Sequence, residues 1–587
     1  MRAIHYRVEA ADLHAHLFRV TLTVPAPATR QRLALPVWIP GSYLVREFSK
    51  HLQNLQASQA GHALPLRQLD KCSWEARCAA GKPLVVTCEV YANDPSVRAA
   101  WLDSARGFFN GTSLFLRVEG QDQAPHELQL VPHKDMARWS AATGLAPKKV
   151  NKAGFGTYRA ADYDELVDCP VEMGRFWSGE FKAGGVPHRF VVAGAPPVFD
   201  GAKLLEDTQK ICEAEIAFWH GREALAARTK PKTPHKSYLF MLNAVDDGYG
   251  GLEHRNSTAL ISTRKDLPRQ GLARQGEGYT TLLGLISHEY FHTWNVKQLR
   301  PAEFALYDYT GENYTQLLWF FEGFTSYYDD LLLRRAGLLD DAGYLRLLNK
   351  TINQVLQTPG REVQSVAQAS FDAWVKYYRQ DENTPNATVS YYAKGSLVAL
   401  CFDLALREHG KATLDDVMRA LYARCNAGPM SEADFIAVLE ELGGKPFGKE
   451  MAAWVHGTRE LPLKDLLEKN GVSVSEDPAQ VAQRLGLRVS DTSGLIVKTV
   501  LRGGAAEQAG LCAGDEWLGV EVAGDGWRIH KLDDLALYVL TGKEFTAVVA
   551  RDKRILRLKL TMPAAVTTWR LALRDAALTS QWLAPAN

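Results

Sequence analysis

The stretch GLISHEYFHTWN, residues 284–295, places two histidines four positions apart, with a glutamate directly after the first. On a helix, residues i and i+4 lie on one face, so His288 and His292 can both offer an imidazole nitrogen to one metal ion. Glu289 is offset around the helix and can reach a water molecule on that ion. The spacing therefore predicts a zinc helix with Glu289 as general base, and a chance match is the alternative.

A catalytic zinc ion usually takes three protein ligands and keeps a fourth position for water. The best third candidate is Glu322, in the apolar stretch WFFEGFTSYYDD (319–330), with 29 residues between it and His292. A carboxylate in such a run is costly to bury without a partner, and a zinc ion would supply one. We expect one Zn²⁺ per chain, while a solvent-facing Glu322 is the competing interpretation.

The composition describes an ordinary globular protein of several domains. The 587 residues are 46% hydrophobic and 23% charged, with a formal net charge of +1. Nucleic acid and anionic membranes select basic patches, so neither is expected as the main partner. The first 18 residues have no signal-peptide core, no apolar run could span a membrane, and the eight cysteines form no CxxC pair. These features favour a cytoplasmic protein with reduced thiols.

The hydrophobic pattern changes twice along the chain and predicts a multidomain α+β protein. Residues 1–175 are rich in strands and predict an N-terminal β-sandwich or curved sheet. Residues 176–465 are mainly helical, and residues 466–587 return to strands. The individual segments are helices at 202–221, 280–299, 313–337, 392–410 and 531–540, strands at 16–24, 83–92 and 236–245, and a hairpin at 545–560.

Four motifs, in this chain order, resemble those of gluzincin metallopeptidases. HEYFHTWN and FFEGFTSYY resemble the two zinc helices, GYGGLEHRNS (248–257) is similar to an exopeptidase motif, and SYYAKGS (390–396) to a Tyr-x-Lys-Gly motif. With LPVWIPGSYLVREFSKHLQNL (35–55), the chain most resembles the glycyl aminopeptidase family, whose members carry a C-terminal PDZ domain. The resemblance implies a thermolysin-like catalytic domain at 176–465 and a PDZ domain with a tail at 466–587.

The sequence departs from the larger zinc aminopeptidases at two points. Leu252 and His254 stand where those enzymes have methionine and asparagine, and the spacing between His292 and Glu322 is longer. Both departures fit the glycyl branch. They weaken the transfer of residue preferences from the larger enzymes.

The resemblance implies that Glu253 binds the free α-ammonium group of the substrate. A carboxylate beside the metal would pair with a cation and disfavour a blocked N-terminus. Gly250 and Gly251 would let the backbone approach and pair with the peptide. The alternative for Glu253 is an ordinary turn residue, and His254 could line the pocket.

The resemblance also implies that Tyr392 is the catalytic tyrosine, whose hydroxyl would donate to the oxyanion. Its neighbour Tyr391 competes for that role. Zinc-activated water would attack the carbonyl, and Glu289 would take the proton and pass it to the leaving amine. Asn295 is near the histidines in sequence, which is no evidence of contact, so the groups that orient them cannot be identified.

In the C-terminal region, LGLRVS (485–490) resembles the peptide-binding loop and strand of a PDZ domain. Leu485, Gly486 and Leu487 would form the carboxylate-binding loop, and residues 488–489 with the helix at 531–540 would flank the groove. Such a groove captures the C-terminus of a partner peptide. A generic β domain, or a groove that the catalytic domain covers, is the alternative.

These features predict a zinc aminopeptidase that removes N-terminal residues from peptides with a free N-terminus. The preference for glycine or alanine comes only from the resemblance. One alternative is a PDZ-bearing metalloendopeptidase, which would tolerate N-acetylated substrates. The other is a peptide-binding protein with an idle zinc site, which would show no chelator-sensitive turnover.

Overall fold

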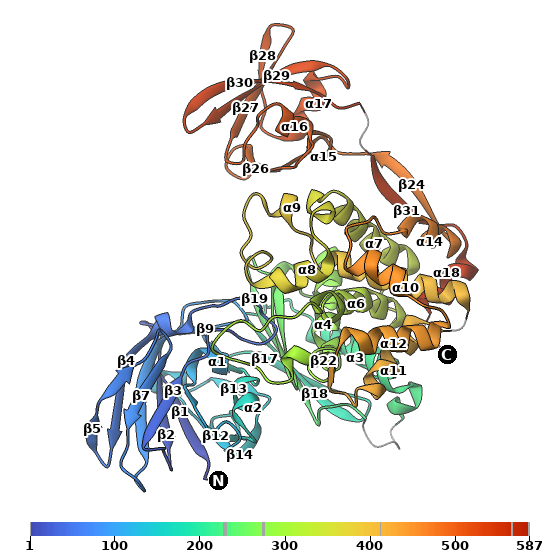
Figure 1. Ribbon diagram of the computed structural model, residues 1–587. Coiled ribbons are helices and arrows are strands. Elements are labelled where there is room, and N and C mark those ends of the chain that lie inside the picture. The colour runs from blue at the N-terminus through green and yellow to red at the C-terminus, as the bar shows by residue number, and fades with distance from the viewer. Residues whose placement is uncertain (1, 227–231, 273–275, 411, 565–566, 585–587) are drawn as a thin grey trace. The chain divides into compact units, whose positions relative to one another are not determined.

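The computed structural model describes residues 2–226, 232–272, 276–410, 412–564 and 567–584 (Figure 1). The chain divides into two compact units, residues 1–314 with 422–431 and residues 315–421 with 432–587. Within the described ranges, no helix is long and apolar enough to cross a membrane. All eight cysteines lie in these ranges, and each is a free thiol.

The first unit begins with a β-rich region built on an eight-stranded sheet. Its strands alternate buried and exposed side chains because successive residues point to opposite faces. The expected strands at 16–24 and 83–92 are confirmed as β2 and β8. In sheet order the strands are β14 (Ala146–Val150), β15 (Gly156–Ala160), β12 (His126–Val131), β1 (Ile4–Asp12), β2 (Leu17–Val24), β8 (Leu84–Tyr91), β4 (Leu52–Gln59) and β5 (His62–Leu64).

Two four-stranded sheets complete this region. One has the order β13 (Ser140–Thr143), β16 (Val171–Gly174), β10 (Arg106–Phe109) and β9 (Ala100–Leu102). The other has the order β11 (Arg117–Val118), β3 (Arg30–Ala34), β7 (Ser73–Arg77) and β6 (Leu66–Gln68). The β-rich character expected for the N-terminal region is therefore confirmed.

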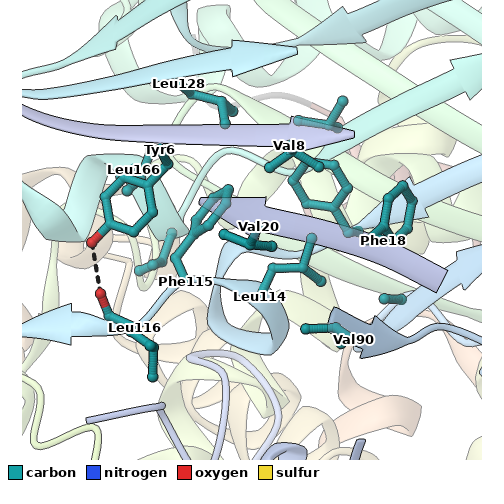
Figure 2. Packing of buried hydrophobic residues seen from close by; sticks show 14 of the residues in the cluster. Tyr6, Val8, Phe18, Val20, Val90, Leu114, Phe115, Leu116, Leu128 and Leu166 are labelled. Carbon is teal, nitrogen blue, oxygen red and sulfur yellow. Dashed lines mark hydrogen bonds between the residues drawn. The ribbon is translucent and has the colours of Figure 1, made fainter. Parts of the chain in front are cut away.

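One hydrophobic core joins the sheets of this region. Figure 2 shows side chains from β1 and β2 packed with those of distant segments, among them Tyr6, Val8, Phe18, Phe115 and Leu128. The Tyr6 hydroxyl donates to the Leu116 carbonyl at 2.7 Å, so its one polar atom is satisfied in the core. The interior therefore has close packing without an unpaired hydroxyl at this position.

A five-stranded mixed sheet follows, with β20 at its edge. Its order is β17 (Trp177–Ala183), β18 (Val186–Ala193), β19 (Tyr238–Val245), β21 (Ser257–Thr263) and β20 (Gly250–His254). Two helices accompany it, α3 (Gly201–His220) and α4 (Glu277–Phe291). The strand expected at 236–245 is confirmed as β19, and the helix expected at 202–221 is α3, which stops at Gly221.

Helix α4 is tied to its surroundings by buried polar contacts. Tyr279 donates to Asp207 on α3 at 2.9 Å, and Ser287 to Glu215 at 3.1 Å. Tyr290 lies 2.9 Å from His188 of β18. The expected helix at 280–299 was too long, because α4 ends at Phe291 and turns follow.

The second unit is helical in its first part. The expected helix at 313–337 is split at Glu322 into α5 (Leu318–Phe321) and α6 (Gly323–Arg335). The one expected at 392–410 is confirmed as α10 (Ala393–His409), with Gly410 left-handed at its end. The other helices include α7 (Asp341–Leu356), α8 (Val366–Phe371), α9 (Thr384–Ala387), α11 (Leu414–Arg424), which runs past the unit boundary, α12 (Glu432–Gly443) and α14 (Leu463–Lys469).

The second unit ends in a small β-rich part with its own core. Its sheet has the order β25 (Leu487–Ser490), β26 (Ile496–Val500), β27 (Glu516–Val522), β29 (Glu544–Arg551) and β30 (Arg554–Thr561), with β28 (Asp525–Arg528) on β27. The expected hairpin at 545–560 is confirmed as β29 and β30. The helix expected at 531–540 is shorter, since only α17 (Leu535–Tyr538) is α-helical.

Two strands connect this β-rich part to the helices. The chain leaves along β24 (Val472–Pro478) and returns along β31 (Thr567–Leu573), which pair antiparallel. It then forms α18 (Ala576–Leu583), where the Trp582 indole donates to the Tyr327 hydroxyl of α6 at 3.0 Å. The last described residues therefore belong to the packing of the helical part.

Candidate active site

The two histidines of the HExxH motif lie at the C-terminal end of α4. Their rings meet edge to face, with centroids 4.7 Å apart. His292 Nδ1 lies 2.8 Å from the backbone carbonyl of Asn295. A carbonyl only accepts, so Nδ1 carries the proton and the Nε2 lone pair of His292 becomes the metal ligand. The orienting group that the sequence could not identify is thus a backbone carbonyl.

Glu322 lies between α5 and α6, and its side chain is only 2% exposed. One ligand atom from each of His288, His292 and Glu322 lies within 4.8 Å of the others. Two imidazoles and one carboxylate form a donor set of catalytic zinc sites. The structure therefore brings the three predicted ligands together, and their chemistry fits Zn²⁺.

Glu289 is buried against the edge strand β20, at Gly251. A Cβ atom on Gly251 would lie 2.0 Å from Glu289 Oε1 and 2.3 Å from its Cδ. Only glycine leaves room for the carboxylate there. The Arg98 guanidinium, from the N-terminal β region, donates to the Gly251 carbonyl at 3.3 Å on the same strand. The predicted general base and the predicted peptide-binding strand are therefore neighbours.

Glu253, two residues further along β20, is 4% exposed. Its Oε1 is fully buried and has no hydrogen-bond partner among the described residues. A buried carboxylate normally has a hydrogen-bond partner. A buried polar group without one costs about 1–3 kcal/mol of stability, and a charged group costs more. Glu253 is therefore available to a cationic ligand.

Asp168 organises the charges next to Glu253. It accepts from His254 Nδ1 at 3.0 Å, from the Arg255 backbone N at 3.2 Å and Nε at 3.1 Å, and from Lys297 Nζ at 3.0 Å. Burial alone would raise the pKa of Asp168, but Lys297 and the hydrogen bond from His254 outweigh it and hold that pKa below its usual value. Burial lowers the pKa of His254, so its imidazole stays neutral near pH 7.

Tyr392 stands at the start of α10 and is partly exposed, whereas Tyr391 is 0% exposed. The hydroxyls of Tyr392 and Tyr378 lie 3.4 Å apart. Burial, and then the charge of Glu322, raises the pKa of Tyr392, so its hydroxyl keeps its proton. Of the two neighbouring tyrosines, Tyr392 is the more exposed.

A close crossing of α6 and α10 holds Glu322 near Tyr392 within the second unit. A Cβ atom on Gly323 would lie 2.6 Å from the Gly395 Cα, a contact between two backbones. Gly323 directly follows Glu322, and Gly395 lies shortly after Tyr392 in the sequence. The lack of side chains at this crossing therefore explains how the two elements approach so closely.

The predicted peptide-binding loop lies in the small β-rich part. Leu485 ends α15 (Val481–Leu485), Gly486 is left-handed with φ 72°, and Leu487 begins β25. Leu485 and Leu487 are buried in the local core. Strand β25 is an edge of its sheet, so its outer backbone groups have no strand partner among the described residues.

Several residues at the site could not be predicted from the sequence. Asp168 lies 86 positions before His254, and no motif marks it or Lys297. Gly41 lies in the stretch 35–55, which carries only a family resemblance, and Arg98 lies outside every motif described above. Tyr378 could have been noticed only as one tyrosine among 21.

Family models and solved structures identify relatives of this chain. Residues 5–175 match the Peptidase M61 N-terminal domain, and residues 281–398 match the M61 glycyl aminopeptidase model. The crystal structure of an aminopeptidase N family protein from Idiomarina loihiensis is 36% identical, with a TM-score of 0.93, over 99% of this chain and 100% of that one. A search of curated proteins gives no match.

Weaker similarity extends to an M1 zinc metallopeptidase from Deinococcus radiodurans. Its structure is 16% identical with a TM-score of 0.48, over 79% of this chain and 96% of that one. A mutant of that enzyme bound to a Tyr-Ser-Ala substrate is 16% identical with a TM-score of 0.46, over 78% and 96% of the two chains.

Proposed function

The chain belongs to the M61 glycyl aminopeptidase family and is a zinc metallopeptidase, and from this premise we propose that it removes N-terminal residues from peptides. The preferred N-terminal residues are small, glycine or alanine, as the family name suggests. The substrate is a peptide with a free N-terminus, which enters along the edge strand β20 and pairs with Gly250 and Gly251.

The observation that carries this proposal is the buried carboxylate of Glu253. Its Oε1 has no hydrogen-bond partner among the described residues, and it lies on the same strand as the glycine that contacts Glu289. A substrate ammonium would supply the missing partner through a charge-assisted hydrogen bond. A peptide whose N-terminus is acetylated would leave Glu253 buried and unpaired, which disfavours its binding.

The remaining residues divide the chemistry of hydrolysis among them. A zinc ion held by His288, His292 and Glu322 would supply Lewis-acid polarisation of the scissile carbonyl and of water. Glu289 removes the proton of the attacking water and returns it to the leaving amine. The Tyr392 hydroxyl donates to the carbonyl oxygen as it gains negative charge. No covalent intermediate on the protein is needed.

The test compares E253Q with the control E180Q, which changes an exposed glutamate on β17 of the same sheet. We expect E253Q to lower kcat/KM for a glycyl peptide by about 10- to 100-fold, the usual worth of a charged hydrogen bond. The rate on the N-acetylated peptide should change little, and E180Q should behave as wild type. An enzyme that cleaves both peptides equally would instead be an endopeptidase.

We also propose that the small β-rich part is a PDZ-type domain with a groove beside β25. The left-handed Gly486 before an edge strand supports this, because backbone N–H groups at such a turn can hold a carboxylate. Fluorescence anisotropy with labelled peptides tests it. A peptide with a free C-terminal carboxylate should bind more tightly than its amide, and equal binding would leave a structural β domain.

A further inference from the structure

A tight turn in the N-terminal β region, residues Ile39–Ser42, lies directly against the Glu253 carboxylate. The Ser42 N–H donates to the Ile39 carbonyl at 3.1 Å, which closes the turn. Pro40 occupies its second position, and Gly41 its third with φ +89°. This is the pattern of a type II turn, which needs a left-handed residue at the third position.

Gly41 also has a steric reason to be glycine. A Cβ atom there would lie 2.4 Å from Glu253 Oε1, 2.5 Å from Oε2 and 2.7 Å from Cδ. These separations are far shorter than any contact between a carbon and a carboxylate, so a side chain at this position would displace Glu253. Gly61, in another turn of the same region, has φ +81° and open space around its Cβ position.

The position of the Glu253 carboxylate depends on this packing. No described residue donates a hydrogen bond to its buried Oε1. Lys297, the nearby cation, donates instead to Asp168 at 3.0 Å. With no hydrogen bond to Oε1, the Gly41 backbone is one of the surfaces that limit where the carboxylate can lie.

We propose that the Ile39–Ser42 turn is one wall of the subsite for the substrate ammonium group, and that Gly41 is a positioning residue for amine recognition. The inference rests on the proposed role of Glu253. The N-terminal β region thereby takes part in selecting substrates with an unblocked N-terminus. The wall occupies the space beside the carboxylate, so the ammonium group approaches Glu253 from the remaining side.

The test compares G41A with G61A, since both place alanine at a left-handed position and only G41A meets the Glu253 carboxylate. We expect G41A to lower kcat/KM for a glycyl peptide by about 10- to 100-fold, with an unchanged zinc content. The ratio of kcat/KM for the free-amine peptide to that for the N-acetylated peptide should fall by a similar factor. G61A should keep wild-type kinetics, and melting temperatures of both variants control for backbone strain.

A double variant separates displacement of the carboxylate from general damage to the fold. In G41A/E253D the shorter side chain withdraws from the new methyl group, so part of the lost selectivity should return relative to G41A alone. The proposal would be overturned if G41A kept the wild-type preference for the free-amine peptide. It would also be overturned if the loss of preference in G41A/E253D equalled the product of the losses in G41A and E253D. A wild-type enzyme without preference for the free amine would overturn the proposed function itself, and this inference with it.

Discussion

Glu253 and Asp168 are two carboxylates of the same unit that differ in their hydrogen bonding. Asp168 accepts hydrogen bonds from His254, Arg255 and Lys297, so its carboxylate oxygens already have partners within the protein. Glu253 has a buried oxygen without a donor among the described residues. Because unpaired buried acceptors are costly, the first arrangement stabilises the fold and the second suits a ligand.

Replacing Glu289 by glutamine tests its role as general base. The amide keeps the size of the side chain but cannot take a proton. We expect kcat to fall by about 100- to 10,000-fold, which is the range for loss of general base catalysis. Metal analysis should show zinc still bound. E277Q, at the exposed start of the same helix, should retain wild-type kcat, and a similar loss in both variants would contradict the assignment.

Removing the hydroxyl of Tyr392 tests its role as oxyanion donor. We expect Y392F to lower kcat by roughly 100- to 1,000-fold, since one such donor is worth about 3–4 kcal/mol in the transition state. KM should change much less. Y391F is the matched control, because Tyr391 is fully buried next to it. A larger loss of kcat in Y391F would transfer the role to that residue.

At the scale of single residues, the motifs predicted three residues that the structure brings together, because the local pattern carries the information. His288, His292 and Glu322 lie within 4.8 Å of one another by ligand atoms, as the helical spacing and the isolated carboxylate suggested. Asp168 and Gly41 act through contacts between segments far apart in the chain. No local pattern marks such contacts, so only the fold identifies them.

At the scale of elements, the prediction failed where one helix crosses another. The expected helix at 313–337 is interrupted at Glu322, next to Gly323, where the backbone of α6 approaches Gly395 of α10. The helical pattern of the sequence continues through this point. The interruption coincides with a tertiary contact that hydrophobic periodicity does not encode.

The contact between α4 and its sheet should make stability depend on pH. His188 of β18 is 1% exposed, and burial lowers its pKa from 6.5 to about 4. Below pH 6.5 the unfolded chain binds a proton that the folded protein does not, so stability falls as the pH is lowered from 6.5 towards 4. The full effect is about 3 kcal/mol.

Urea denaturation of the metal-free protein at several pH values measures this dependence. Between pH 6.5 and 4, the free energy of unfolding should fall less in H188Q than in wild type, by about 3 kcal/mol. At neutral pH we expect H188Q to be less stable than wild type. H62Q, at an exposed position of β5, should follow wild type. Parallel curves for wild type and H188Q would show that His188 does not titrate as proposed.

At the scale of the whole molecule, the composition and the change of pattern predicted an α+β protein with several parts. The return of the chain along β31 to α18 was not predicted, because the β24–β31 pairing joins segments about 95 residues apart. Local sequence carries no register for such a pairing. The last described residues therefore pack with the helices instead of forming a simple tail.

Trp582 should be essential to this closing contact. Its side chain is 0% exposed, and it packs near Tyr344 with ring centroids 5.8 Å apart. We expect W582A to reduce the free energy of unfolding by about 3–5 kcal/mol through the cavity it leaves. W527A, at a residue 47% exposed on β28, should cost far less. Urea denaturation measures both losses. If W582A and W527A lowered the free energy of unfolding equally, Trp582 would not be essential to the packing of α18.

The most direct measurement compares initial rates on a glycyl peptide and its N-acetylated counterpart, with zinc-loaded protein, with a chelator, and after zinc is restored. We predict hydrolysis of the free-amine peptide only, abolished by the chelator and recovered with zinc. Equal cleavage of both peptides would contradict Glu253 as the amine anchor, and hydrolysis that the chelator leaves unchanged would contradict the metal site.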